Sequence, residues 1–309
     1  MLKWGLLLTG VLLLITNHAT IFISGNVQIV LFVLGMVLVG IPHGAADMLI
    51  AKQTAINSNT TFSLPLFLAI YLSKVLLFGI FIYYFTGVGI ILFIILASYH
   101  FGETDLYFIN TTTAVGKLLV FTYGLLILAT LLLHHITTVN ELIQPLLQHT
   151  HITLNIRWIQ ANNSIILSIT TLLLLATLFI YLLNNNDHKA PFELVLIQNA
   201  IIVLLLYFMP LILGFTFYFI IWHSVVSLHK ILLYLHKHGK YSYATIVKQI
   251  GLYSSLSYVG ITIIVVIANV FVSSSNLILL SILSLSVLTL PHMHIMKSMY
   301  GTMRTKYAA

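Results

Sequence analysis

Residues 87–105 read GVGIILFIILASYHFGETD, an apolar run that ends in a histidine and two acids. The run has about the length that a membrane-spanning helix needs. His100 and Glu103 are three residues apart and would share one face of that helix. An ionisable group at membrane depth is costly unless it has a partner, so it is by default a candidate for function. The polar end of this run is therefore a candidate site inside a membrane protein.

The composition extends this interpretation to the whole chain. Apolar residues make up 60% of the 309 residues and charged residues only 6%, whereas a soluble domain carries about 25% charged residues. The apolar runs suit helices and lack the two-residue alternation of a barrel. We therefore predict an all-α fold, a polytopic transmembrane helical bundle that forms one integral membrane domain over residues 1–309.

The apolar runs predict about ten spans. Two junctions between neighbouring runs are short, one at Thr86–Gly87 and one at Pro210, so eight or nine spans stay open. The predicted spans cover roughly residues 4–22, 27–50, 63–85, 87–104, 117–134, 163–183, 193–209, 211–232, 249–272 and 276–296.

The basic residues orient this map, because loops on the cytoplasmic side are enriched in Lys and Arg. With the N-terminus inside, eleven of the 13 basic residues fall on the cytoplasmic side, only Arg157 falls outside, and Lys74 lies within a span. We therefore expect a multi-pass protein of the cell membrane with both termini in the cytoplasm. The net charge of +7 comes from residues scattered at the ends of spans, which does not indicate nucleic-acid binding.

Histidines are the only plentiful metal ligands. The chain has no cysteine, six acids and 14 histidines, so a bound metal would be held mainly by imidazole. A second polar segment, IPHGAAD at 41–47, places His43 and Asp47 four residues apart on one helix face. A histidine beside a carboxylate is the usual pairing of a metal ligand with the group that orients it. Asp47 and Glu103 are the candidates for that orienting role.

Two further histidines complete the candidate set. His223 lies in an aromatic-rich run, and His292 follows Pro291 near the end of the last span. In the span map His43, His100, His223 and His292 fall at a similar depth near the inner side of four different spans. Inward-facing side chains on several helices are how bundles build metal sites. On regular helices His229 and His294 would point away from His223 and His292.

These segments, taken in order, are similar to a known family. The motifs Pro42–Asp47, His100–Phe101–Gly102, Tyr218–Phe219 with Trp222–His223–Ser224, and Leu290–Pro291–His292 resemble the Brp/Blh family of membrane-bound β-carotene 15,15′-dioxygenases. The resemblance implies cleavage of β-carotene by O₂ at its central double bond into two molecules of retinal, often destined for a rhodopsin. It also implies non-haem iron, Fe²⁺, held by histidines, with His43, His100 and His223 at the positions of family ligands.

The chain departs from the family pattern at one position. The family often carries a second histidine four residues after that of the Trp-His motif, where this chain has Ser227. The fourth ligand is then His292, His229 or water, and His292 is the one we expect.

Two other functions compete with a carotenoid dioxygenase. A di-iron membrane desaturase or hydroxylase needs more histidines, gathered in boxes such as HxxxH, which this chain lacks. A transporter for a metal or a proton would carry polar residues across the full depth of the bilayer. The polar groups here gather at one depth, which favours a fixed site.

Overall fold

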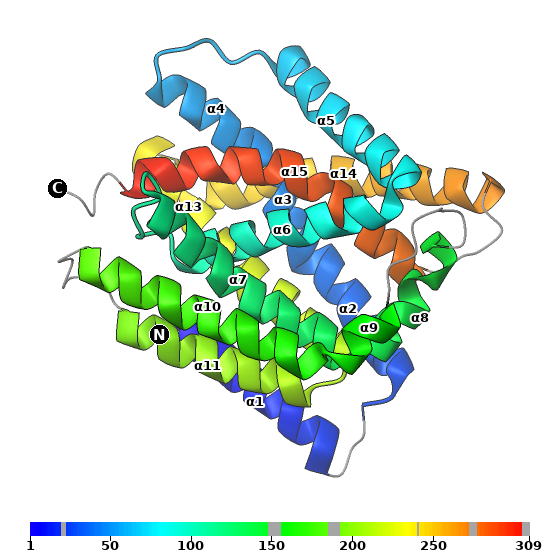
Figure 1. Cartoon of the computed structure of the whole chain (residues 1–309). Helices are drawn as coiled ribbons and strands as arrows, with labels where there is room; N and C mark the ends of the chain where they lie inside the picture. Colours follow the sequence, from blue (N-terminus) through cyan, green and yellow to red (C-terminus); the bar gives the residue numbers. More distant parts are fainter. Residues whose placement is uncertain (20–22, 148–155, 185–191, 240, 272–276, 305–309) are drawn as a thin grey trace.

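A computed structural model describes residues 1–19, 23–147, 156–184, 192–239, 241–271 and 277–304. Over these ranges the ordered elements are helices and no strand occurs, and Figure 1 shows them packed as one bundle. The predicted all-α fold is confirmed. The helices are α1 (Leu2–Ala19), α2 (Gly25–Gly35), the π-helix η1 (Met36–Gly40), α3 (Ile41–Ala45), α4 (Asp47–Asn57), α5 (Leu64–Tyr84), α6 (Thr86–Asp105), α7 (Ala114–His134), α8 (Ile136–Leu147), α9 (Ile156–Ala161), α10 (Asn163–Asn184), α11 (Phe192–Phe208), α12 (Leu211–Phe215), the π-helix η2 (Thr216–Ser224), α13 (Val225–Gly239), α14 (Tyr243–Phe271) and α15 (Leu277–Arg304).

Over the described residues, each predicted apolar run is covered largely by one helix or by consecutive helices. The run 27–50 is covered by α2, η1, α3 and α4, and the run 211–232 by α12, η2 and α13. Among the described residues, six helical segments are long and apolar enough to cross a membrane. Helices α8 and α9 lie between the predicted spans 117–134 and 163–183, where no helix was predicted.

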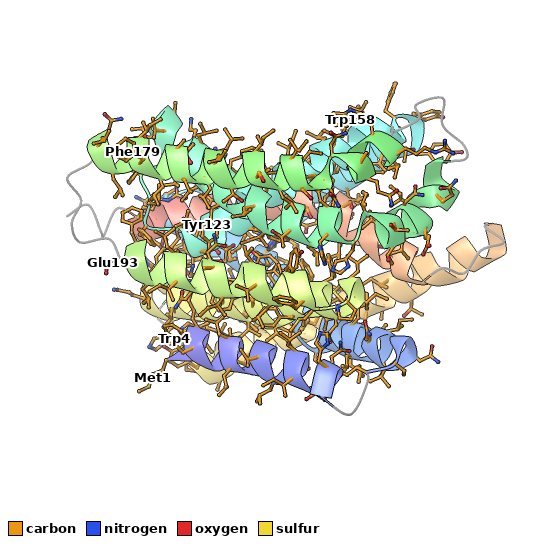
Figure 2. All side chains as sticks on the ribbon, turned by 60° about the horizontal axis from the view of Figure 1, so that its bottom comes forward. Met1, Trp4, Tyr123, Trp158, Phe179 and Glu193 are labelled. Atoms are coloured by element: carbon orange, nitrogen blue, oxygen red, sulfur yellow. The ribbon has the colours of Figure 1, made fainter. Side chains whose placement is uncertain are left out.

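The outer surface of the bundle is apolar. Leu77 of α5 is 67% exposed and Phe179 of α10 is 64% exposed, whereas Tyr123 of α7 is only 1% exposed. Figure 2 shows Phe179 on the outside and Tyr123 between the helices. Soluble monomers rarely expose large contiguous apolar patches. The surface therefore suits contact with lipid chains, as the composition predicts.

Helices α6 and α7 pack with their backbones in close contact. Gly102 of α6 faces the carbonyl oxygen of Val120, and Gly124 of α7 faces that of Ser98, so closely that a methyl group on either glycine would overlap the carbonyl. Small residues allow this kind of approach between helices in membranes. The contact fixes the part of α6 that carries His100.

The end of α6 also holds the two terminal helices. Lys3 of α1 forms an ion pair with Asp105 at 2.9 Å, and Arg304 of α15 forms one with Glu103 at 2.5 Å. The indole of Trp222 donates a hydrogen bond to Asp105 at 2.9 Å. The start of α1 and the end of α15 therefore lie at the same end of the bundle. Figure 1 shows α8 and α9 at its opposite end.

Two clusters of buried apolar residues form the core. The larger includes Phe101, Phe217 and Trp222, from α6 and η2. The smaller includes Ala46 and Met296, from the junction of α3 with α4 and from α15. The larger cluster includes residues of α6 and η2, which carry His100 and His223. The smaller cluster includes residues beside His43 and residues of α15, which carries His292. The candidate histidines therefore come from helices of both clusters.

The close contact of α6 and α7 predicts the effect of a single methyl group. Gly124→Ala should lower the free energy of unfolding by about 1–3 kcal/mol, because the Ser98 carbonyl cannot move away without displacing the helix. Gly260→Ala is the matched control, since nothing lies within 4 Å of the added methyl group. Thermal unfolding in detergent measures both, and equal melting temperatures for the two variants would contradict the packing described.

Candidate metal centre

Four buried imidazole rings lie next to one another inside the bundle. They belong to His43 of α3, His100 of α6, His223 of η2 and His292 of α15, and their exposed fractions are 5%, 2%, 1% and 7%. The ring centroids are 4.8 Å apart for His43 and His292, 4.9 Å for His292 and His100, 4.9 Å for His100 and His223, and 5.6 Å for His223 and His43. Each ring therefore neighbours two others, and the four form a closed set.

The nitrogens of these rings form a set of possible metal ligands. The Nε2 atoms of His43, His100, His223 and His292 are all buried, and none has a hydrogen-bond partner among the described residues. One ring nitrogen each from His43, His100 and His223 lie within 4.8 Å of one another. Buried polar atoms almost always have a partner, and neutral imidazole nitrogens are common metal ligands. The residues present therefore fit a bound metal ion.

Hydrogen bonds fix the tautomers of two rings. His43 Nδ1 lies 2.8 Å from the carbonyl oxygen of Gly40, which can only accept, so Nδ1 carries the proton and Nε2 carries the lone pair. His292 Nδ1 lies 2.7 Å from Asp47 Oδ1 and in the same way donates to that carboxylate. Tyr71 of α5 donates to the other oxygen of Asp47 at 3.1 Å. Two of the four Nε2 atoms are thus prepared to bind a cation.

Two of the predicted apolar runs, 27–50 and 211–232, are each covered by several consecutive helices, and each of the two contains a π-helix beside its histidine. The backbone N–H of Ile41 donates to the carbonyl of Met36, five residues back, and η1 ends at Gly40, three residues before His43. His223 lies within η2, which extends over nine residues. Such wider turns change the direction of the side chains that follow, and they occur frequently at functional sites. Nothing in the local sequence predicted either of them.

Aromatic side chains enclose the rings. Phe101 lies 4.7 Å from His223 between ring centroids, and Phe219 stacks on the same ring at 5.9 Å. Phe219 also stacks on Phe215 at 5.4 Å, and Phe215 lies 5.8 Å from Phe32. A row of phenylalanines therefore leads from the histidines to α2, and the neighbourhood of the rings is apolar.

The two predicted orienting carboxylates have different partners from those expected. Spacing suggested that Asp47 would serve His43, but Asp47 accepts from His292, on a distant helix. Glu103 shares a helix face with His100, yet its partner among the described residues is Arg304. Glu103 therefore holds α15 against α6, and Asp47 is the acid that contacts the ring cluster.

The structure also locates the histidines that were expected to point away. His229 and His294 are both exposed, so neither joins the cluster. Ser227, at the position where the family often has a histidine, is fully buried. No sequence motif indicated a role for Tyr71, because its contact with Asp47 depends on where α5 packs.

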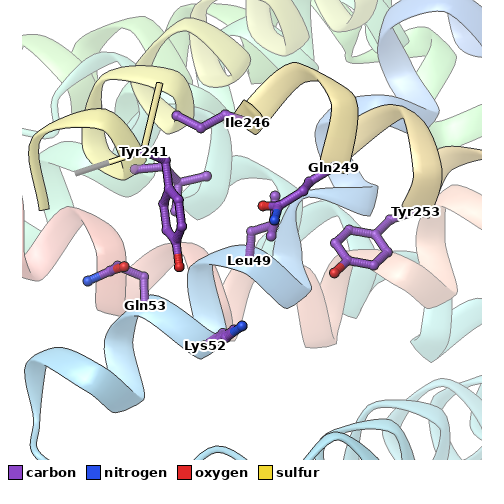
Figure 3. A pocket seen from close by; sticks show the side chains of 8 residues that line it. Leu49, Lys52, Gln53, Tyr241, Ile246, Gln249 and Tyr253 are labelled. Atoms are coloured by element: carbon purple, nitrogen blue, oxygen red, sulfur yellow. The ribbon is translucent and has the colours of Figure 1, made fainter. Parts of the chain in front are cut away.

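A small pocket lies elsewhere, between α4 and α14. Its volume is about 20 Å³, which is room for about one water molecule. Figure 3 shows Leu49 and Lys52 of α4 facing Gln249 and Tyr253 of α14 across it. A pocket of this size is too small for an organic substrate. The histidine cluster is therefore the stronger candidate for the functional site.

Comparison with known proteins agrees with this choice. The sequence model of a family described as beta-carotene 15,15'-dioxygenase matches residues 34–300, a range that contains all four clustered histidines. Neither a curated protein nor a solved structure matches the chain.

Removing one ring should empty the centre. We expect His43→Ala, His100→Ala, His223→Ala and His292→Ala to insert into the membrane but to purify without metal, because water replaces a buried imidazole ligand poorly. His229→Ala is the control, since that side chain is exposed. Elemental analysis of the purified proteins measures the difference. A variant of the four that keeps the metal content of the unmodified protein would show that its histidine is not a ligand.

Asp47→Asn tests the carboxylate that contacts His292. Loss of the charge weakens the hydrogen bond to Nδ1, and changes of this kind typically cost about 10–100-fold in metal affinity. Glu193→Gln, an exposed acid on α11, is the matched control. Metal competition with a chelator gives the affinities, and an Asp47→Asn affinity equal to that of the control would make the carboxylate purely structural.

Proposed function

The chain belongs to the beta-carotene 15,15'-dioxygenase family, and we propose that it cleaves β-carotene at the central double bond within the membrane. O₂ is the second substrate, and the products are two molecules of retinal. Fe²⁺ is the cofactor, held by His43, His100, His223 and His292.

One observation carries the proposal: four buried imidazole rings from four helices lie side by side, and none of their Nε2 atoms has a hydrogen-bond partner among the described residues. Imidazole nitrogens suit iron among the transition metals, and a set without a carboxylate leaves the ion its full charge. Bound there, Fe²⁺ would supply the redox chemistry that O₂ needs in order to react with the polyene. The absence of cysteine removes thiolate as a competing ligand.

The protein's own residues prepare this centre. The Gly40 carbonyl and the Asp47 carboxylate hold protons on the Nδ1 atoms of His43 and His292 and so leave the lone pairs of these rings on Nε2. Tyr71 holds Asp47 in place from α5. Because these groups are ordered before a substrate arrives, binding requires no rearrangement of the ligands.

The row of phenylalanines forms a suitable binding surface for the proposed substrate. β-Carotene is an apolar polyene that dissolves in the bilayer, and an apolar wall both binds it and excludes water from reactive intermediates. Phe101 and Phe219 lie against the rings, and Phe215 and Phe32 continue the row. We place the chain of the substrate along these four side chains.

The distribution of Lys and Arg supports an orientation of the bundle in the membrane. We place both termini in the cytoplasm, because the basic residues favour that side. The shared end of the bundle occupied by Lys3 and Arg304 supports this placement. The histidine cluster then lies in the half of the membrane nearer the cytoplasm.

Expression in a β-carotene-producing host tests the activity. Chromatography of the pigments should show loss of β-carotene and appearance of retinal, whereas His100→Ala should leave the pigment intact and His229→Ala should not. Shorter or longer apocarotenals would exclude central cleavage. Unchanged pigment with altered fatty acids would indicate a desaturase, and unchanged pigment with altered metal uptake a transporter.

Reporter fusions test the orientation. A fusion after Ala309 should report the cytoplasm, and one after Asn162, between α9 and α10, should report the opposite side, because α15 ends at one end of the bundle and α9 lies at the other. Each position is fused to two reporters in separate proteins, one reporter active only in the cytoplasm and one active only on the opposite side. At each position, one reporter should therefore be active and the other inactive. Both sites on one side would overturn the span map.

A further inference from the structure

A second cavity, outside the histidine cluster, is lined by lysines. It has a volume of about 550 Å³ and lies among α5, α6, α7 and α15. Lys74 of α5, Lys117 of α7 and Lys297 of α15 line it, together with Tyr99 of α6. No acidic residue is among the described side chains that form its wall. Three cations from three helices thus share one hollow that has no anion.

Lys74 has the most unusual position of the three. It is the eleventh of the 21 residues of α5, a helix long and apolar enough to span a membrane. With a rise of about 1.5 Å per residue it lies about 15 Å from either end of the helix. A charged side chain at such a depth is costly and normally has a partner. The ion pairs of the described residues involve Lys3, Arg304 and His292, so Lys74 has no carboxylate.

The acids that could neutralise the cavity are engaged elsewhere. The charge of Lys297 reaches Glu103, but that carboxylate pairs with Arg304 at 2.5 Å. Asp105 pairs with Lys3 at 2.9 Å. Neither acid is therefore left to pair with the lysines of the cavity, two of which, Lys117 and Lys297, are exposed and open to a ligand.

We propose that this cavity binds the phosphate headgroup of an anionic phospholipid. Lys117 in the first turn of α7 and Lys297 in the last third of α15 lie toward the side that we place in the cytoplasm, and Lys74 lines the same cavity from the middle of α5. Basic pockets between spans on the cytoplasmic side suit such headgroups. The surroundings favour a lipid over a free anion: Leu290 and Met293 also line the cavity, and α5 exposes Leu76 and Leu77 beside it, at 63% and 67%. Phosphate oxygens accept hydrogen bonds from the ammonium groups and from the Tyr99 hydroxyl, while the acyl chains lie along α5.

The bound lipid would join α5 to the metal centre. Lys74 lies one helical turn after Tyr71, the residue that donates to Asp47. Met293 and Tyr99 are the sequence neighbours of His292 and His100. A headgroup that contacts Lys74 and Lys297 together therefore bridges α5 and α15 and holds Tyr71 against Asp47.

Lipid binding to the delipidated, purified full-length protein tests the proposal. Native mass spectrometry should detect phosphatidylglycerol bound in preference to phosphatidylcholine, and phosphatidylglycerol should raise the melting temperature. Each lysine near a headgroup contributes about fivefold in affinity. Lys74→Gln and Lys297→Gln should each weaken phosphatidylglycerol binding about fivefold and together about 25-fold. Lys248→Gln, an exposed lysine on α14, is the charge-matched control.

Three results would overturn the proposal. The first is equal binding of phosphatidylglycerol by Lys74→Gln, Lys297→Gln and Lys248→Gln. The second is equal binding of phosphatidylglycerol and phosphatidylcholine by the unmodified protein. The third is an equal melting shift with inorganic phosphate alone, which would make the cavity a site for a soluble anion. If the double variant fails to fold, the two single variants decide. All readouts are independent of carotenoid cleavage.

Discussion

The interior of a bilayer offers no water, so each polar group in this bundle needs a partner from the protein or from a ligand. The three acids in the spans obey this constraint: Asp47 pairs with His292, Glu103 with Arg304 and Asp105 with Lys3. These pairs bring together helices that are distant in the sequence, including both terminal ones. What remains is a set of imidazole nitrogens that face one another. The same constraint thus assembles the bundle and leaves the centre ready for a cation.

The division of labour between acids and histidines has a chemical consequence. A carboxylate that binds a metal directly neutralises part of its charge, whereas a carboxylate that holds a ring proton strengthens the ligand and leaves the ion's charge intact. Asp47 takes the second role through His292. Gly40 performs it for His43 with a neutral carbonyl. A metal ion bound in this apolar site would keep the charge that favours electron-rich substrates such as a polyene.

Hydropathy predicted the positions of the helices well because it is a local property, although six of the described helical segments, against about ten predicted spans, are long and apolar enough to cross a membrane. Hydropathy and helical spacing did not predict the hydrogen-bond and ion-pair partners of the acids. Asp47 and His292 are 245 residues apart, and helical spacing pointed to His43 instead. Glu103 has the right spacing for His100, but Arg304 lies close enough to pair with it. The π-helices escaped prediction because one wider turn costs little and depends on the packing around it.

Ser227 explains why the fourth ring comes from α15. This residue is fully buried and lies beside Tyr300 of α15. A serine occupies little volume, so α15 can approach α13 there, and Tyr300 reaches Thr104 on α6 at 3.3 Å. Two turns before Tyr300, the same helix carries His292 into the cluster. A histidine at 227 would compete for the space that α15 occupies. The departure from the family pattern and the position of His292 are therefore two aspects of one packing arrangement.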